Sequence, residues 1–484
     1  MGRRAGRKYP ALQVAPAGWA HENRTAGNVG HSQGVTVYAI LDEATRRARK
    51  YLAGLGDRGV MPPLPAVNAL RKLEEALPVS GTDPAATLAL LDDVVSPATM
   101  AMAGSRFFGF VCGGSVPVSL AANWLAGAWD QNAALHLVTP GVSSVERVAL
   151  RWLVELLELP AGSGGAFVTG ATVANFTALA AGRNAVLRRV GWNVEAAGLF
   201  GAPVITVISG EEAHPSMLKS LGMLGLGRSR VVRVPVDGQG RMRPEALPEI
   251  RGPSILCLQA GNVNTGSFDD FEALIPRARA AGAWVHVDGA FGLWAKAAPA
   301  LRPLVRGLGQ ADSWATDAHK WLNVPYDSGL AFVRDANTLK AAMAITAEYL
   351  PTDTDERNPC DFTPELSRRA RGVEVWAVLR TLGRTGLAEL FERNCRQARR
   401  FADGLRAAGY EVPNDVVLNQ VLVTFGDPQR TRNVIEALQR EGTCWCGGTV
   451  WQGKTAMRIS VSSWATTDED VERSLAAMLR VAAA

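Results

Sequence analysis

Short runs of apolar, β-branched residues alternate with helical stretches through the middle of this sequence. The runs are GAFVTG (165–170), PVITVIS (203–209), SILCLQAG (254–261), AWVHVDGA (283–290), SWATDAHK (313–320) and GLAFVRD (329–335). Runs of this kind are typical of strands buried on both faces, and helices between them can connect parallel strands. The pattern predicts an α/β domain over residues 105–345, with a mostly parallel central sheet covered on both faces.

The flanking segments have different patterns. Residues 1–35 are rich in Gly, Arg, Ala and Asn without periodicity, which predicts a flexible N-terminal arm, and an N-terminal helical segment is expected over 36–104. From Ser144, apolar residues at three- and four-residue spacing predict an amphipathic helix that Pro160 ends. Residues 373–484 combine helical stretches with two strand-like runs, and we expect a smaller C-terminal α+β domain there.

Composition excludes several classes of function. The 484 residues contain 51 Lys and Arg against 46 Asp and Glu, and the net charge of +5 owes much to the opening MGRRAGRK, so no general attraction for nucleic acid is expected. No uncharged apolar stretch of membrane-spanning length and no secretory signal are present, and six cysteines in such a length make no disulfide framework. We expect a cytoplasmic protein with reduced thiols and without nucleic-acid or membrane partners.

The first strand leads into a candidate phosphate site. GAFVTG ends at Gly170 and continues through Ala171 and Thr172 into a helical stretch. Free N–H groups at a helix N-terminus favour an anion, Gly170 permits close backbone approach, and the Thr172 hydroxyl can donate. Taken alone, however, this pattern is explained better by an ordinary capped helix.

Three more side chains follow the ends of predicted strands, where open parallel sheets bind ligands. Asp288 ends AWVHVD, and a buried carboxylate needs a cationic or donating partner. Lys320 ends SWATDAHK, and His214 comes after PVITVIS. Each has a simpler explanation by itself, because lysines are usually solvated and single histidines usually structural.

Together these features match the needs of one cofactor, pyridoxal phosphate. Its phosphate suits the helix start, and its aldehyde needs an amine that can form a Schiff base. A carboxylate beside the pyridine nitrogen keeps that nitrogen protonated, and an imidazole can stack on the ring. We therefore predict that the chain binds pyridoxal 5'-phosphate.

Several segments also resemble a known family. FVTGATVANFTAL, HPSMLKS, VHVDGAFG and TDAHKWLNVPYDSG, with SRFFGFVCGGSVPVSLAANWL upstream and RRARGVEVWAVLRTLG downstream, are similar to segments of the group II pyridoxal-phosphate-dependent amino-acid decarboxylases, which include aromatic-amino-acid and glutamate decarboxylases. The resemblance covers most of the chain after about residue 35. It implies an aspartate-aminotransferase-like fold (fold type I), a homodimer with active sites at the interface, and decarboxylation of an L-amino acid.

The resemblance also implies roles for individual residues. Lys320 would form the Schiff base, Asp288 would pair with the pyridine nitrogen, His214 would stack on the ring and Ala290 would pack on its other face. Ala171, Thr172 and His319 would meet the phosphate, and Asn262 would lie near the 3-oxygen. Gly170 and Asp317 would be further cofactor contacts. Phe107, Phe108 and Phe362 would line the substrate pocket.

The sequence departs from the family pattern in one segment. The family's mobile active-site loop, expected here over 346–372, carries a Tyr that protonates the intermediate after carbon dioxide leaves, whereas Asp361-Phe362 stands where Asp-Tyr is expected. Tyr349 and His214 are the other candidate acids. Decarboxylation to an amine, decarboxylation coupled to oxidation to an aldehyde, and transamination therefore all stay open.

Some features of the sequence allow other interpretations. Arg458 lies where related aminotransferases hold a substrate carboxylate, but a surface or interdomain ion pair explains it equally well. A metal-dependent hydrolase could use His286, Asp288 and His319, but that leaves Lys320 and the phosphate turn without a role, so we predict no metal. A non-catalytic scaffold predicts loss of the lysine or the aspartate, and both are present. The Gly-rich stretch 161–165 precedes a strand, which is the wrong order for a dinucleotide loop.

Overall fold

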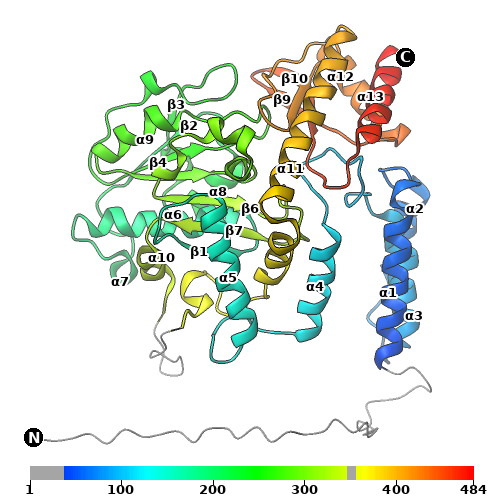
Figure 1. The fold of residues 1–484 in the computed structure, drawn as a ribbon, viewed down its shortest axis with the longest axis horizontal. Coiled ribbons are helices and arrows are strands. Elements are labelled where there is room, and N and C mark those ends of the chain that lie inside the picture. The colour runs from blue at the N-terminus through cyan, green and yellow to red at the C-terminus, as the bar shows by residue number, and fades with distance from the viewer. Residues whose placement is uncertain (1–36, 346–355) are drawn as a thin grey trace, which may run out of the picture.

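The computed structural model describes residues 37–345 and 356–484. Its central sheet has the order β1-β7-β6-β5-β4-β2-β3, and only β7 runs against its neighbours (Figure 1). The strands are β1 (Gly164–Val168), β2 (Thr206–Gly210), β3 (Val232–Val234), β4 (Ser254–Gln259), β5 (Trp284–Asp288), β6 (Ser313–Asp317) and β7 (Gly329–Val333). The predicted fold class, α/β with a mostly parallel sheet, is confirmed.

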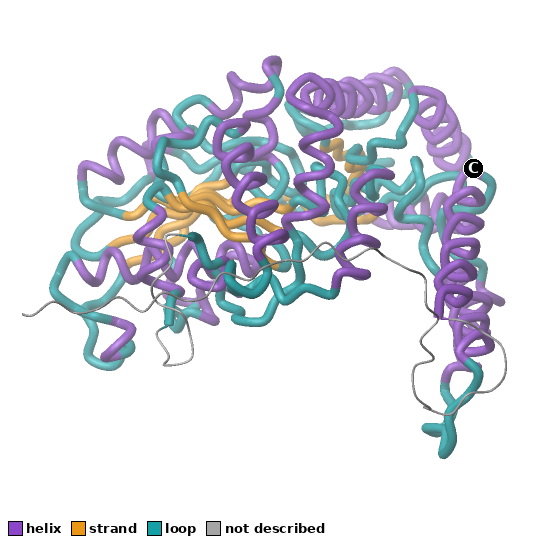
Figure 2. The backbone as a smooth tube through the Cα atoms, turned by 60° about the horizontal axis from the view of Figure 1, so that its bottom comes forward, coloured by secondary structure: helices purple, strands orange, loops and turns teal. Residues whose placement is uncertain are grey.

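Helices cover both faces of this sheet, which Figure 2 shows as a twisted band between them. One face packs against α6 (Ala171–Arg188), α8 (Pro215–Met223) and α10 (Ala336–Met343), and the other against α5 (Pro140–Leu156), α9 (Phe271–Ala280) and α11 (Gly372–Ala407). Consecutive strand residues alternate between the two apolar clusters, as Phe167 and Val168 do, because side chains alternate across a strand. Both faces are therefore apolar, which explains the continuous apolar runs in the sequence. A short helix, α7 (Val194–Ala197), follows α6.

The C-terminal part of the chain forms a smaller antiparallel sheet with its own core. Its order is β8-β10-β9, made of β8 (Gln420–Val423), β9 (Gly447–Trp451) and β10 (Lys454–Ser460), and α11, α12 (Pro428–Glu441) and α13 (Asp468–Ala483) pack against it. The helical stretch of α11 is interrupted at Gly383, whose φ of 57° favours glycine.

The N-terminal helices α1 (Val37–Ala53), α2 (Leu64–Ala69) and α3 (Pro84–Val95) stand as a column beside α4 (Pro117–Trp129) (Figures 1 and 2). The predicted arm 1–35 and residues 346–355 of the predicted loop 346–372 lie outside the described residues. None of the helices in the described part of the chain has the length and apolar character needed to cross a bilayer.

Two local predictions differ from the structure. The helix expected from Ser144 begins at Pro140, because a proline at the first helical position suits a helix start. The strand β3 was not predicted, since it is a three-residue edge strand with two exposed side chains.

Candidate active site

The ends of several strands meet at one edge of the central sheet. Asp288 ends β5, and β5 pairs with β6, which ends at Asp317. Gly329, the first residue of β7, pairs with Asp317 on one side and with Val168 of β1 on the other. The turn after β1 and the segment after β6 therefore lie together, as the sequence predicted for strands of a doubly covered sheet.

The Asp317 carboxylate connects the predicted lysine to the predicted phosphate turn. Its Oδ2 lies 2.7 Å from the Nζ of Lys320, and its Oδ1 accepts a hydrogen bond from the Ala171 N–H at 2.5 Å. The Nε2 of His319 lies 3.5 Å from Oδ1. Because Ala171 is the first residue of α6, an anionic group already sits at this helix N-terminus. The structure thus brings Lys320, His319 and the α6 turn together.

Close backbone packing shapes this cradle. A Cβ added to Gly329 would lie 2.5 Å from the Cα of Gly170, and a Cβ on Gly170 would lie 3.1 Å from the Cε1 of His319. His319 accepts the Ser328 N–H at Nδ1, so its Nε2 carries the proton in the neutral ring. The buried Ser328 hydroxyl has no hydrogen-bond partner among the described residues. An anion bound here would meet this Ser328 hydroxyl.

Asp288 is buried, with 4 % of its surface exposed. Its Oδ1 accepts the Ala290 N–H at 3.2 Å, and its Oδ2 accepts from the Asn175 side-chain amide at 3.0 Å. No lysine, arginine or histidine in the described part of the chain lies within ion-pair distance of this carboxylate. A buried carboxylate without a cationic partner is suited to a cationic ligand atom.

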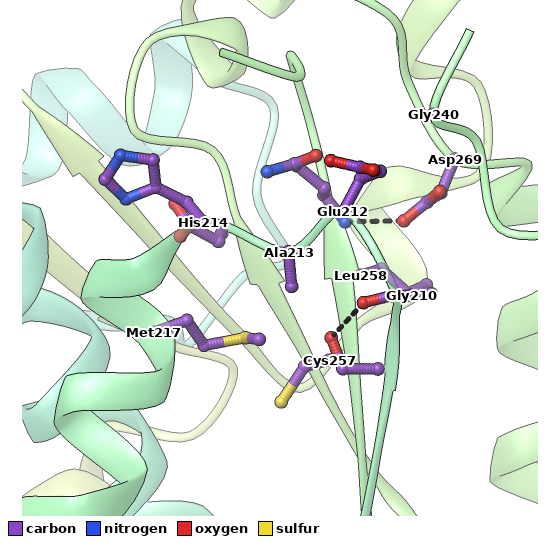
Figure 3. A pocket seen from close by; sticks show the side chains of 12 residues that line it. Gly210, Glu212, Ala213, His214, Met217, Gly240, Cys257, Leu258 and Asp269 are labelled. Atoms are coloured by element: carbon purple, nitrogen blue, oxygen red, sulfur yellow. Dashed lines mark hydrogen bonds between the residues drawn. The ribbon is translucent and has the colours of Figure 1, made fainter. Parts of the chain in front are cut away.

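His214 lies at the start of α8 beside a small pocket between β2 and β4 that Asp288 also lines. Figure 3 shows His214 at the rim of this pocket, with Met217 and Cys257 below it. Its Nδ1 accepts the Ser216 N–H, which leaves the proton on Nε2. Burial lowers the pKa of His214, while the nearby Asp288 carboxylate raises it and the nearby Lys320 lowers it. His214 is therefore close to both charged groups.

Two further residues predicted to contact the cofactor make hydrogen bonds within the protein. The Asn262 side chain, 1 % exposed, donates to Gln259 Oε1 and accepts the N–H groups of Asn264 and Thr265. The Thr172 carbonyl accepts from the Ser220 hydroxyl at 2.8 Å. Asn262 thus holds its own loop beside the pocket.

The predicted substrate-pocket residues Phe107 and Phe108 are both buried in the single chain. Phe107 stacks on Trp445 with ring centroids 5.0 Å apart, and Phe108 lies in the core of the smaller sheet. The exposed ring of this segment is Phe110, which is 61 % exposed and stacks on Trp445 at 5.5 Å.

Backbone hydrogen bonds explain this arrangement. Residues 106–108 add to the smaller sheet, since the Phe108 N–H donates to Trp445, the Trp445 N–H donates to Arg106 and the Ser460 N–H donates to Phe108. This pairing places Phe107 against Trp445 and Phe108 against the core, and the next residues turn toward the large domain.

Phe362 belongs to a short 3-10 helix, Pro359–Phe362, and is buried. The Arg357 guanidinium covers its ring at 4.1 Å, and the ring packs with the α6 side of the sheet. In the described chain Phe362 is thus a packing residue, and its predicted place in the substrate pocket stays a prediction. Tyr349 lies outside the described residues.

Some residues near Lys320 were not predicted. A Cβ on Gly113 would lie 2.3 Å from the Lys320 carbonyl oxygen, so the segment after Phe110 packs directly on the lysine backbone. The Cys112 thiol lies 3.2 Å from the Tyr326 hydroxyl, and the Tyr326 ring stacks on His319 at 4.2 Å. No local sequence signal identifies this group, because its members are brought together only by the fold.

Arg458 is a half-buried cation on β10 of the smaller domain. Its guanidinium donates to the Val263 carbonyl at 3.3 Å, and no carboxylate of the described residues lies within ion-pair distance. Burial lowers its pKa, and its charge in turn lowers the pKa of His214. The interdomain ion pair considered from the sequence is not found in the described residues.

The residues of the metal interpretation are used in other ways. Both ring nitrogens of His286 have side-chain partners, at 2.9 Å each. Within residues 37–345 and 356–484, no group of three or more candidate ligands could hold a metal ion.

Comparison with known proteins identifies the family. Residues 68–425 match the family described as pyridoxal-dependent decarboxylase conserved domain. The chain belongs to this family. The expectation of a pyridoxal-phosphate-dependent carboxy-lyase is thereby confirmed, and the cofactor of this decarboxylase is pyridoxal 5'-phosphate.

Individual relatives are distant but cover most of the decarboxylase chain. An aromatic-L-amino-acid decarboxylase of Bacillus atrophaeus is 27 % identical over 367 residues, 73 % of this chain and 74 % of the relative. A phenylacetaldehyde synthase of Arabidopsis thaliana is 26 % identical over 433 residues, 83 % of this chain and 87 % of the relative. The solved structure of Oryza sativa TDC with PLP and tryptamine superposes with a TM-score of 0.86 at 22 % identity, covering 94 % of this chain and 99 % of that chain, which shows a shared fold.

The residues present fit the cofactor. The α6 N-terminus accepts a carboxylate in this structure and can accept a phosphate, and the Ser328 hydroxyl nearby is unpaired among the described residues. The Asp288 carboxylate has donors but no cation, as pairing with a protonated ring nitrogen requires. Lys320 supplies the amine close to both.

Proposed function

We propose that this decarboxylase removes the α-carboxylate of an L-amino acid with an aromatic side chain, and that Lys320 carries its cofactor. The observation that carries the proposal is the meeting of Lys320, the uncompensated Asp288 carboxylate and the α6 N-terminus at one sheet edge. When bound, pyridoxal phosphate supplies an aldehyde that binds amines and a ring that accepts the electrons released with carbon dioxide.

The protein groups have separate tasks in this proposal. The N–H of Ala171 and the Nε2–H of His319 would hold the phosphate, and Asp288 would hold the ring nitrogen and its proton. The His214 ring, fixed by its bond from Ser216, would cover the cofactor with its Nε2–H toward the reacting atoms. Lys320 would hold the cofactor aldehyde and give up its place to the substrate amine, and Asp317 would hold the released lysine ammonium.

We propose that Arg458 binds a substrate carboxylate. A half-buried guanidinium that is not neutralised by a described carboxylate attracts an anionic ligand group. Its charge lowers the pKa of His214, which supports a position near the proposed site.

The exposed ring of Phe110 supports an aromatic substrate. Phe110 presents its face next to the segment that packs on Lys320, and Trp445 backs it. Offset stacking of a substrate ring on such a surface stabilises binding by about 0.5–1.5 kcal/mol beyond area burial. Two of the relatives act on or form aromatic compounds according to their names.

A second candidate is decarboxylation with oxidation to an aldehyde. Phe362, which stands in place of the expected loop Tyr, is buried against Arg357 and offers no acidic hydroxyl. One relative is a phenylacetaldehyde synthase, so both outcomes occur among similar chains. The products distinguish the two: an amine without oxygen uptake supports the first, and aldehyde, ammonia and peroxide with oxygen uptake support the second.

We also propose a homodimer in the cytoplasm. A broad groove between the N-terminal column and α4 is lined by apolar side chains, and Leu52, Leu91 and Trp124 are exposed along it. Exposed apolar surface of this extent is typical of a protein interface. The six cysteines are free thiols, which suits a reducing compartment. Sedimentation of the Trp124→Glu variant tests the interface, since a charge there should favour the monomer.

The decisive experiment is spectroscopic. The purified protein, loaded with pyridoxal phosphate, should absorb in the visible range, and borohydride should bleach the band and leave pyridoxyl mass on the peptide containing Lys320. Lys320→Ala should fold normally and yield neither labelled peptide nor turnover of aromatic amino acids. Label on another lysine, or turnover by Lys320→Ala, would contradict the assignment.

A further inference from the structure

A continuous row of buried hydrogen bonds lies behind Asp288. Trp284 Nε1 lies 2.8 Å from Ser313 Oγ, which lies 2.9 Å from His286 Nδ1. His286 Nε2 is 2.9 Å from Asn175 Oδ1, and Asn175 Nδ2 is 3.0 Å from Asp288 Oδ2. Asn175, His286 and Ser313 are completely buried. Only the carboxylate at the end of this row has a role in the proposed function.

Chemistry permits one arrangement of protons along the row. An ionised carboxylate only accepts, so Asn175 must turn its NH2 to Asp288 and its oxygen to His286. That oxygen needs a donor, and the proton of the imidazole must therefore lie on Nε2. In a neutral ring Nδ1 then accepts, so the Ser313 hydroxyl donates to it, and the Trp284 N–H donates to the Ser313 oxygen. All four bonds are satisfied at once.

The row brings no positive charge to the carboxylate. His286 touches no carboxylate, and burial lowers its pKa to about 3, so the ring is neutral at physiological pH. The donors reach Asp288 only through hydrogen bonds from the Asn175 amide and the Ala290 N–H. Its negative charge stays free for a ligand.

We propose that His286 and Asn175 are positioning residues that hold the Asp288 carboxylate in one orientation and in its ionised form for a cationic ring nitrogen. The inference rests on the proposed function, because it assigns Asp288 to that nitrogen. His286 prevents the Asn175 amide from rotating, since the reversed amide would place its oxygen against the carboxylate and its NH2 against the Nε2–H. The bond from Asn175 holds one oxygen of the Asp288 carboxylate, so the carboxylate keeps one orientation toward the ring nitrogen.

The first test uses the protein without cofactor. Nitrogen NMR of histidine-labelled protein should show one neutral ring with its proton on Nε2 from about pH 5 to about pH 8, the range in which an ordinary imidazole titrates. The resonance is assigned by its loss in His286→Gln, and it should shift in Asn175→Leu. A proton on Nδ1, or protonation of this ring within the range, would overturn the proposal.

The second test measures cofactor binding in Asn175→Leu, His286→Leu and His286→Gln. Losing a hydrogen bond to a buried charge should weaken pyridoxal phosphate binding about tenfold or more in the two leucine variants, and ring-nitrogen NMR should show loss of the ring proton. His286→Gln keeps an N–H toward Asn175 and should restore both; it also carries the test if His286→Leu does not fold.

The matched control is Asn419→Leu, which removes a buried amide of the smaller domain that donates to the Val461 carbonyl and the Ser462 hydroxyl. It should lose stability but keep the cofactor affinity and the ring proton. Unchanged binding and ring protonation in Asn175→Leu would overturn the inference while leaving the proposed function intact. Wild-type protein that does not bind the cofactor would instead refute the proposed function.

Discussion

Replacing Gly329 by Ala should displace the β1–α6 turn that we expect to bind the phosphate. The added Cβ would lie 2.5 Å from the Cα of Gly170 and 2.7 Å from its nitrogen. Non-bonded carbon atoms rest about 3.5–4.0 Å apart, so the start of β7 and the β1–α6 turn must separate by about 1 Å. Both contacts are with backbone, and no side chain can rotate away to relieve them.

The substitution should lower both the folding stability and the affinity for the cofactor. Overpacking of this kind costs about 1–3 kcal/mol of folding free energy. The displaced turn carries the Ala171 N–H, and losing one hydrogen bond to a charged ligand costs about 1.5–3 kcal/mol. Pyridoxal phosphate should therefore bind about tenfold to a hundredfold more weakly. Equilibrium dialysis gives the dissociation constant, and urea unfolding without cofactor gives the loss of stability separately.

Gly448→Ala is the matched control, because Gly448 also lies in a strand and its added Cβ would meet only the tip of Ile435 at 3.4 Å. It should bind the cofactor as the wild type does. A folded Gly329→Ala protein with wild-type affinity would show that the β1–α6 turn does not hold the phosphate. Equal weakening in both variants would show that the effect is not specific to the turn.

Three further outcomes are expected. Asp288→Asn should lower kcat about a hundredfold to a thousandfold in steady-state assays, because a neutral amide stabilises a cationic ring less; a fall below tenfold would speak against its role. Glu146→Gln should lower the free energy of unfolding by about 3–5 kcal/mol, since the buried Glu146 pairs with Arg357 at 3.0 Å and Arg368 at 2.7 Å, and an unchanged urea midpoint would contradict this. In the folded protein the pKa of His286 is lowered to about 3, against an ordinary value of 6.5, so as the pH falls the unfolded chain binds a proton on this residue before the folded protein does. The contribution of His286 to the free energy of unfolding is therefore complete above about pH 6.5 and is lost as the pH falls toward 3. Stability should drop about 2 kcal/mol more from pH 7 to pH 5 in the wild type than in His286→Gln, as urea titrations at both values can show.

The sheet and the charged residues at its edge could be predicted because the information is local. The apolar runs identify the strands, and Asp288 and Lys320 lie at or just after the ends of β5 and β6, which pair in parallel. Strand β3 has no such signal in three residues. The interruption at Gly383 depends on backbone conformation, and glycine is also tolerated within helices.

The substrate side of the site could not be predicted in the same way. In the stretch RFFGF, nothing local shows which ring is exposed, and the choice of Phe110 depends on pairing with Trp445, more than 300 residues away in sequence. The bond between Asn175 and His286 likewise joins residues 111 positions apart. Such contacts follow from the packing of α6 on β5, not from either segment alone.

The strand-like pairing of residues 106–108 with the C-terminal sheet decides how substrate preference can be exchanged between relatives. Phe110, the ring proposed to contact the substrate, lies early in the sequence. It is held in place by the last third of the chain, through stacking on Trp445 and backbone hydrogen bonds of residues 106–108. A chimera that imports only a relative's C-terminal domain would pair a foreign Trp445 equivalent with a native Phe110 and lose the fit between them. A chimera that takes residues 105–113 together with that domain keeps Phe110 and Trp445 from the same protein. The two distant segments should therefore be exchanged together.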